Sequence, residues 1–114
     1  MPKTPKRLAG PALVDSTVET VYTVPAVTKT IVRHIHVQNP SAGYITLTLS
    51  IGTDGAATRI LDAVPIAPTA TGSMANVVDF FCYYVLEAAE IIQADSDTDD
   101  ILTLTINGDE FTLG

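Results

Sequence analysis

The stretch TKTIVRHIHVQNPSAGYITLTLSIG, from Thr28 to Gly52, decides the fold that the sequence predicts. In its second half, apolar and polar residues alternate strictly. The apolar residues of this half are Ile45, Leu47, Leu49 and Ile51. An alternation with a period of two predicts a strand with one buried and one exposed face.

The first half of the same stretch alternates less cleanly. This pattern places Ile31, Ile35 and Val37 on one face with Arg33, and it places on the other face Val32, His34, His36 and Gln38. Residues 39–43, Asn-Pro-Ser-Ala-Gly, are typical of a turn. We therefore predict an antiparallel hairpin with one apolar face, which needs a second layer to cover it.

Further strands are predicted on both sides of this hairpin, at spacings of about ten residues. They cover residues 12–14, 17–24, 58–66, 77–86, 91–94, 101–107 and 110–113, with a turn expected at Asn107-Gly108. No segment has a convincing helical pattern. The sequence thus predicts an all-β fold: an antiparallel β-sandwich, jelly-roll-like, with seven or eight strands.

Residues 77–86, VVDFFCYYVL, are bulky and apolar on both faces of the predicted strand. In a domain of two layers only one of these faces can point into the core. The other face then needs a partner chain. We expect this strand to form the interface of a homo-oligomer, with a trimer as the preferred state, through Val77, Phe81, Tyr83 and Val85.

Length and composition indicate one globular domain. The 114 residues are 46% hydrophobic and 17% charged, which excludes a disordered chain. There is no apolar run of about 18 residues, so no membrane span is expected, and no signal peptide is recognised at the N-terminus. A single cysteine excludes an internal disulfide framework.

Charge is distributed unevenly along the chain. Residues 1–10 contain Lys3, Lys6 and Arg7 and no acid, whereas residues 11–114 carry a net charge of −10. The overall charge of −7 argues against a nucleic-acid binder. We expect residues 1–11 to be an extended basic arm that anchors the protein to an acidic partner, and residues 12–114 to be the sandwich domain.

Three groups of residues are candidates for chemistry. His34 and His36 leave one face of a strand, as zinc or iron ligands do, but no third ligand follows them in the sequence. The acidic residues of 95–100 lack the glycine and the glutamate of a calcium loop, and a looser calcium site there remains open. Cys82 lies in an apolar run without a base. We expect no catalytic residue, no cofactor and no metal.

The sequence resembles small β-sandwich virion proteins of tailed bacteriophages. The resemblance covers most of residues 18–108. It is carried by residues 22–26 (YTVPA), 35–39 (IHVQN), 51–52 (IG), 86–88 (LEA), 92–94 (IQA) and 102–108 (LTLTING). Ala89-Glu90 stands where the pattern has Gly-Asp. The resemblance implies a structural role on the capsid, neck or tail, without catalysis.

From these features we expect a non-enzymatic phage virion protein that is assembled in the host cytoplasm. The preferred version is a capsid decoration (cement) protein, which binds itself and the major capsid protein or another virion protein, but neither nucleic acid nor membrane. A neck, tail or fibre-attachment protein is one alternative. A carbohydrate- or receptor-binding β-sandwich module is the other.

Overall fold

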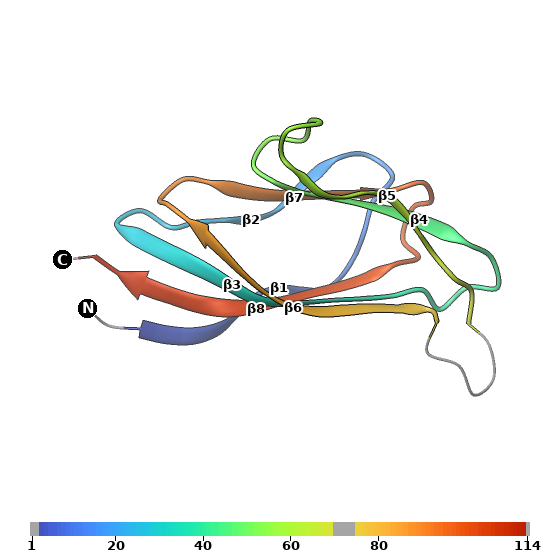
Figure 1. Cartoon of the computed structure of the whole chain (residues 1–114), viewed down its shortest axis with the longest axis horizontal. Helices are drawn as coiled ribbons and strands as arrows, with labels where there is room; N and C mark the ends of the chain where they lie inside the picture. Colours follow the sequence, from blue (N-terminus) through green and yellow to red (C-terminus); the bar gives the residue numbers. More distant parts are fainter. Residues whose placement is uncertain (1–2, 70–74, 114) are drawn as a thin grey trace.

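Two antiparallel sheets of four strands face each other in a computed structural model, which describes residues 3–69 and 75–113 (Figure 1). No helix occurs among the described residues. In chain order the strands are β1 (Lys3–Leu13), β2 (Glu19–Thr23), β3 (Thr28–Gln38), β4 (Ile45–Ile51), β5 (Arg59–Ile66), β6 (Val77–Leu86), β7 (Ile91–Ser96) and β8 (Thr103–Thr112).

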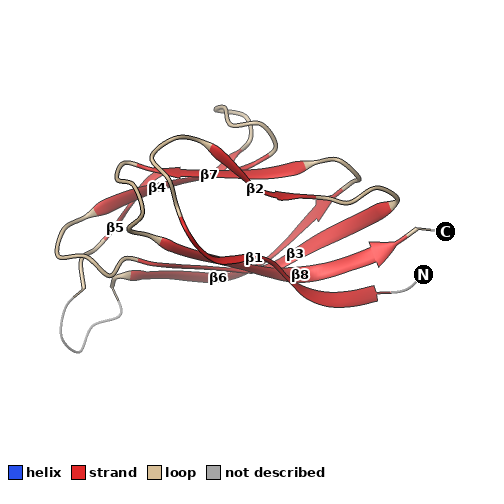
Figure 2. Ribbon diagram, turned by 180° about the vertical axis from the view of Figure 1, so that it is seen from behind, coloured by secondary structure: helices blue, strands red, loops and turns tan. Residues whose placement is uncertain are grey.

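The strands pair in the order of a jelly roll. One sheet has the order β1-β8-β3-β6 and the other the order β2-β7-β4-β5. The first strand therefore pairs with the last, the second with the seventh, the third with the sixth and the fourth with the fifth. This is the pairing of a long hairpin rolled into two layers. The predicted fold class is confirmed, and both layers are visible from behind in Figure 2.

The core lies between the two sheets and is filled from both. Alternation along β4 buries Ile45, Leu47 and Leu49, as the sequence predicts. Side chains with almost no exposed surface come from both layers and include Val32, Ile35, Val37, Leu47, Leu49, Ile66, Leu86, Ile92, Leu104 and Ile106. Each buried Leu or Ile contributes about 1.5–3 kcal/mol to folding.

The predicted hairpin of residues 28–52 is wrong in its pairing, although both of its strands exist. β3 pairs with β6 and β8, whereas β4 pairs with β5 and β7. The turn at residues 39–43 therefore carries the chain from one sheet to the other. The alternation pattern does not distinguish a hairpin within one sheet from a crossing between two sheets. In both arrangements the apolar faces of the two strands point into the same core.

Asn39 holds this crossing in place. Its fully buried side chain donates through Nδ2 to the carbonyl oxygens of Gly43 at 2.9 Å and Ile66 at 3.0 Å. Its Oδ1 accepts from the backbone N–H and the hydroxyl of Ser41. The Asn39 backbone exchanges two further hydrogen bonds with Asn76. The side chain and backbone of Asn39 thus tie together the end of β3, the end of β5 and the start of β6.

A β-bulge at Arg33 corrects the predicted faces of β3. The register of β3 shifts between Val32 and His34 against both of its neighbours. As a result Val32 belongs to the core, while Ile31 lies outside the core cluster. Gly108 sits opposite the bulge inside β8, and not in the expected turn. A Cβ there would lie 2.2 Å from the carbonyl oxygen of Ile31, so only glycine lets the two strands come this close.

The expected N-terminal arm is instead an edge strand. β1 pairs with β8 from Lys3 to Leu13, and Leu8 is buried in the core. The register shifts between Ala9 and Ala12, but the β1–β8 ladder continues beyond residue 11 to Leu13. Prolines suggested an irregular segment, but an edge strand tolerates them because one side of its backbone needs no ladder partner. Removing residues 1–11 would uncover β8 as well as delete the basic residues.

A polar contact across the core joins β1 to the second sheet. Tyr22 of β2 bonds through its hydroxyl to Thr30 at 2.7 Å and to the Glu110 carboxylate at 2.5 Å. Lys6 of β1 pairs with the other oxygen of Glu110 at 3.2 Å. Burial, and then the Glu110 carboxylate, raise the pKa of Tyr22, so its hydroxyl remains a donor.

We predict that Asn39→Ala lowers the free energy of unfolding by roughly 2–4 kcal/mol, because buried carbonyl oxygens lose their donor. Urea denaturation measures this loss. The matched control is Ser41→Ala, which removes one partner of Oδ1 together with exposed contacts of the hydroxyl to Gly43, and should cost about 1 kcal/mol or less. Equal losses for the two variants would show that the turn, and not the buried amide, holds the crossing.

Candidate functional site

The outer face of the β1-β8-β3-β6 sheet carries an exposed apolar strip on β6. Phe81 is 85% exposed, Tyr83 62% and Val85 47%. The intervening residues Val78, Phe80, Cys82 and Tyr84 pack against the core. The prediction that β6 is apolar on both faces is confirmed: one face covers the core and the other meets solvent. Val77, at the start of the strand, is half-buried.

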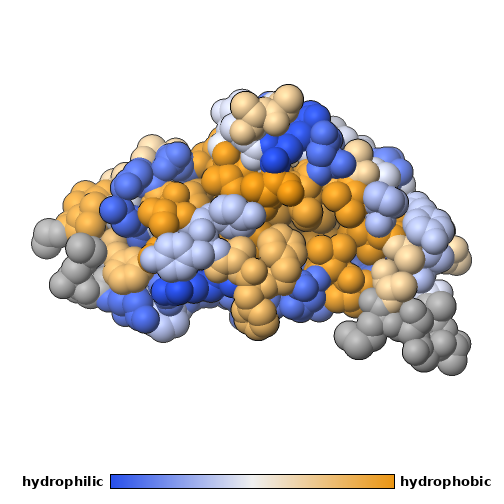
Figure 3. Space-filling view, viewed as in Figure 1, coloured by the Kyte–Doolittle hydropathy of each residue, from blue (hydrophilic) through white to orange (hydrophobic). Residues whose placement is uncertain are grey.

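Partly exposed apolar residues continue around the edge of β6 toward the second layer. β6 and β5 are edge strands of their sheets. Figure 3 shows a hydrophobic band across the middle of the molecule, in the region where Figure 1 draws β6 below β4 and β5. Half-buried residues of these edges that pack against the core include Ile60, Leu61, Phe80, Cys82 and Tyr84.

Polar side chains of β3 and β8 line the exposed strip. The bulge directs both Arg33 and His34 to the outer face. Arg33 pairs with Asp109 at 2.9 Å, and its guanidinium carbon lies 5.0 Å from the centre of the Tyr83 ring. The His34 ring lies 5.0 Å from the Phe81 ring, centre to centre. The two exposed aromatic side chains are therefore held by contacts with β3.

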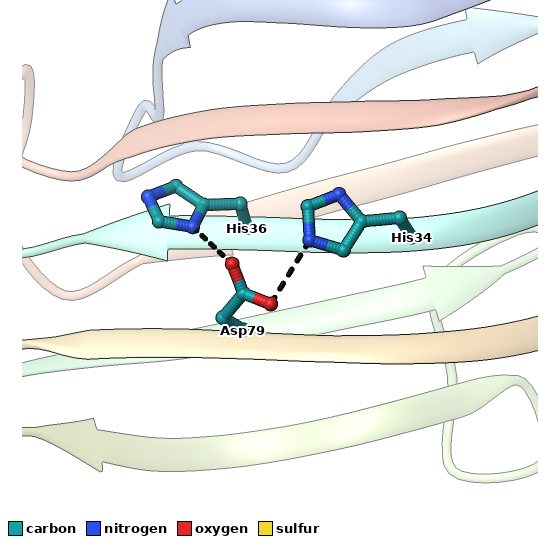
Figure 4. A group of neighbouring side chains, drawn as sticks. All are labelled: His34, His36 and Asp79. Atoms are coloured by element: carbon teal, nitrogen blue, oxygen red, sulfur yellow. Dashed lines mark hydrogen bonds and ion pairs between the residues drawn. The ribbon is translucent and has the colours of Figure 1, made fainter.

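Two histidines of β3 and one aspartate of β6 meet on the same outer face (Figure 4). His34 Nε2 lies 2.9 Å from Asp79 Oδ1, and His36 Nδ1 lies 2.6 Å from Asp79 Oδ2. Asn107 of β8 donates from Nδ2 to His34 Nδ1 at 3.1 Å. The hydrogen bonds from His36 and then from His34 lower the pKa of Asp79 below its ordinary value of 3.8.

Sequence reasoning missed Asp79 as a neighbour of the histidines. It lies 43 residues after His36, and only the register of β3 against β6 places the two opposite each other. A signal was present, because Asp79 is the only charged residue of an otherwise apolar strand. Among the described residues, these three side chains form a group that could hold a metal ion. β6 therefore supplies the third candidate ligand that the sequence pattern lacked.

The acidic residues of 95–100 do not converge on one point. Asp97 accepts a hydrogen bond from the Thr46 backbone, whereas Asp99 accepts one from the Ser16 backbone at 2.6 Å and pairs with Asp15. The hydrogen bond to Asp99 raises the pKa of Asp15 to about 6, and the pKa of Asp99 falls to about 2. Below about pH 6 these two carboxyl groups share one proton. The hydrogen bond from the Ser16 backbone to Asp99 links the β1–β2 connection to the β7–β8 turn.

The other residues that the sequence suggested as functional lie away from His34 and His36. Cys82 points toward the core and contacts the Val32 carbonyl oxygen, and burial raises the pKa of its thiol. Lys3, Lys6 and Arg7 lie exposed on β1, at the opposite edge of the sheet. The described residues enclose no pocket. They also include no helix that could cross a membrane.

Comparisons with known proteins give distant structural likenesses. No family model matches the chain, and no curated protein matches it. A crystal structure of a pentameric capsid protein isolated from metagenomic phage sequences aligns with 89% of this chain at 16% identity and a TM-score of 0.36. A second such pentameric capsid protein, solved by iodide SAD phasing, aligns with 89% at 20% identity and a TM-score of 0.35.

The chain spans about 60% of the length of these capsid proteins, with 59% of the first and 60% of the second covered. At this level of similarity the two structures carry no argument about function.

We predict that the wild type is more stable than Asp79→Asn at pH 5, and that this advantage shrinks as the pH falls. The folded-state pKa of Asp79 lies below its ordinary value of 3.8. Its ionised form therefore contributes stability above that value, which is lost as the pH falls through the folded-state pKa. Melting temperatures between about pH 5 and pH 2 measure the effect. A difference between wild type and Asp79→Asn that stays constant over this range would contradict the prediction.

Proposed function

We propose that this protein is a non-enzymatic structural protein of a bacteriophage virion, which self-associates through β6 and decorates an assembled capsid. The observation that carries the proposal is the long, mainly apolar edge of β6. Ten residues of β6 present an unpaired edge with no proline, no lysine and no arginine, and with Asp79 as the only charge. Edges of this kind pair with other chains unless they are blocked.

The other three sheet edges are protected. β1 contains Pro5 and Pro11 together with its basic residues. β2 has only five residues. β5 contains Pro65 and two register shifts against β4. Prolines, charges, short strands and bulges are the devices by which natural sheets prevent edge pairing. β6 has one charge and one register shift against β3, but it is ten residues long and contains no proline and no cation, which favours this strand as the contact.

The outer face of β6 supports the same proposal. Phe81, Tyr83 and Val85 are exposed side by side, and burying each would contribute about 1.5–3 kcal/mol to association. Aromatic residues such as these dominate the energy of protein interfaces. A jelly roll is a fold from which viral shells are built. The sequence resemblance to small virion proteins of tailed phages agrees with this role.

Decoration needs no catalysis. A protein that binds only assembled shell subunits stabilises the shell by mass action. The partner is then the major capsid protein or another virion protein, and the protein resides in the virion after assembly in the host cytoplasm. The same surfaces fit a neck, tail or fibre-attachment protein. Immunogold labelling of intact particles tests the whole proposal: label over the shell supports decoration, label at the neck or tail supports that alternative, and unlabelled particles contradict both.

A second candidate is a carbohydrate- or receptor-binding module. It is favoured by the exposed ring of Tyr83 beside Arg33 and the histidines, because sugar rings stack on exposed aromatics next to polar groups. Binding to a glycan array that is lost in Tyr83→Ala would favour this candidate. This candidate requires that Tyr83 stays free to bind the glycan, and it therefore excludes self-association through the same ring.

We predict that Tyr83→Glu weakens self-association at least about 30-fold, because a charge at a packed interface is left without a partner. Sedimentation velocity at micromolar concentration measures the oligomer, for which we propose a trimer, and distinguishes it from a pentamer. The control is Tyr44→Glu, because Tyr44 is also exposed, at 68%, but lies outside β6. A wild type that stays monomeric at these concentrations would contradict self-association.

We further propose that Lys3, Lys6 and Arg7 anchor the protein to the particle, now as part of edge strand β1. Lys6 is partly neutralised by Glu110, whereas Lys3 and Arg7 have no carboxylate partner among the described residues. Lys3→Gln/Arg7→Gln should leave the melting temperature almost unchanged. It should bind stripped particles more weakly, with a shallower salt dependence, because exposed charges act through a screened attraction.

The matched control for the anchor is Lys29→Gln, which removes a cation from β3 on the same sheet. Binding of Lys29→Gln should equal that of the wild type. If the double variant binds as well as the wild type at both low and high salt, the basic residues of β1 are not an anchor, and the apolar face of β6 carries attachment alone.

A further inference from the structure

We propose that His34, His36 and Asp79 form a binding site for a divalent transition metal ion of the zinc type on the outer face of the β1-β8-β3-β6 sheet. The site combines two imidazole nitrogens with one carboxylate oxygen. Three such protein ligands with an open position are the usual set of a zinc site that is accessible to solvent or to a further ligand. The proposal is independent of the virion role.

The distances suit a small ion. Zinc bonds to nitrogen and oxygen of about 2.0–2.2 Å, in tetrahedral geometry, place the ligand atoms roughly 3.4 Å apart. The three ligand atoms all lie within 4.8 Å of one another, and each histidine is already within 2.9 Å of the carboxylate. The side chains of His34, His36 and Asp79 are 22%, 37% and 41% exposed, so they have room to make this small adjustment.

The backbone holds the three side chains on one face. His34 and His36 stand two residues apart after the bulge, and His36 lies directly opposite Asp79 in the β3–β6 ladder. Directly opposed residues of an antiparallel pair have Cβ atoms about 5 Å apart. The central position of β3, between β8 and β6, keeps this spacing rigid. The site is therefore built on strands and does not depend on a loop.

With its amide reversed, Asn107 would supply the outer support that zinc-binding histidines need. The histidine that binds zinc through Nε2 donates its Nδ1–H to a neighbouring acceptor. Asn107 lies at hydrogen-bond distance from His34 Nδ1, and reversal of its amide presents Oδ1 as that acceptor. The geometry thus assigns Nε2 of His34 and Nδ1 of His36 as the ligand atoms.

The donor set also distinguishes among metals. Imidazole nitrogens suit zinc and its neighbours, whereas Mg²⁺ and Ca²⁺ prefer sites made of oxygen atoms. Without metal, the same three side chains satisfy one another by hydrogen bonds. The fold therefore does not require the ion, and a bound ion adds stability only by mass action.

Calorimetric titration of the full chain with zinc chloride at neutral pH tests the proposal. We expect one zinc per chain, and no heat from magnesium chloride. The chain has only two histidines, both in this site, so histidine-dependent binding reports on it alone. His36→Gln and Asp79→Asn should each weaken zinc binding about tenfold or more. Asp100→Asn and Cys82→Ala, which change groups outside the site, should bind zinc as the wild type does.

Nitrogen-15 NMR of the two imidazoles gives a readout that unspecific binding would not produce. Saturating zinc should shift Nε2 of His34 and Nδ1 of His36, so the two rings take opposite tautomers. Absence of zinc binding would overturn the proposal, as would wild-type affinity in both His36→Gln and Asp79→Asn. Coordination of both rings through the same nitrogen would also overturn it, because this backbone presents different nitrogens to Asp79.

Discussion

The buried amide of Asn39 is the constraint on which the arrangement of the strands depends. A turn of this composition would ordinarily return the chain beside β3 as a hairpin. Instead the amide binds carbonyl oxygens at Gly43 and Ile66, so the chain leaves β3 toward the layer that contains β5. Once β3 and β4 lie in different sheets, β3 is free to pair with β6 and β8, and β4 with β5 and β7. The rolled pairing needs a change of sheet at every connection except β4–β5, and Asn39 secures the one between β3 and β4.

The second constraint is the bulge of β3 opposite Gly108. One extra residue reverses the alternation, so Val32 faces the core while Arg33 and His34 share the outer face. Without the bulge, His34 and His36 could not both stand outside together with Arg33 while Ile35 and Val37 fill the core. Bulges often re-aim side chains in this way at functional positions. The polar half of the candidate site is thus a consequence of one irregularity in the ladder.

Local patterns were sufficient to predict the strands and insufficient to predict their neighbours. The alternation of β4 and the two-sided apolar character of β6 each follow from a few adjacent residues. The pairing of His36 with Asp79 depends on a register set by the whole β3–β6 ladder, which no local pattern encodes. The edge position of β1 also depends on the whole sheet. Prolines indicate an irregular segment in the sequence alone, and they are compatible with a strand only if that strand lies at an edge.

The candidate site and the proposed interface meet at Asp79. An inward or outward charge on an edge strand normally discourages pairing with other chains, and Asp79 is the only such charge on β6. Here both of its oxygens are occupied by His34 and His36, so the carboxylate is held back against β3. The apolar residues Phe81, Tyr83 and Val85 then face solvent without a competing free charge. The same two contacts that define the candidate metal site therefore hold the one charge of β6 against β3.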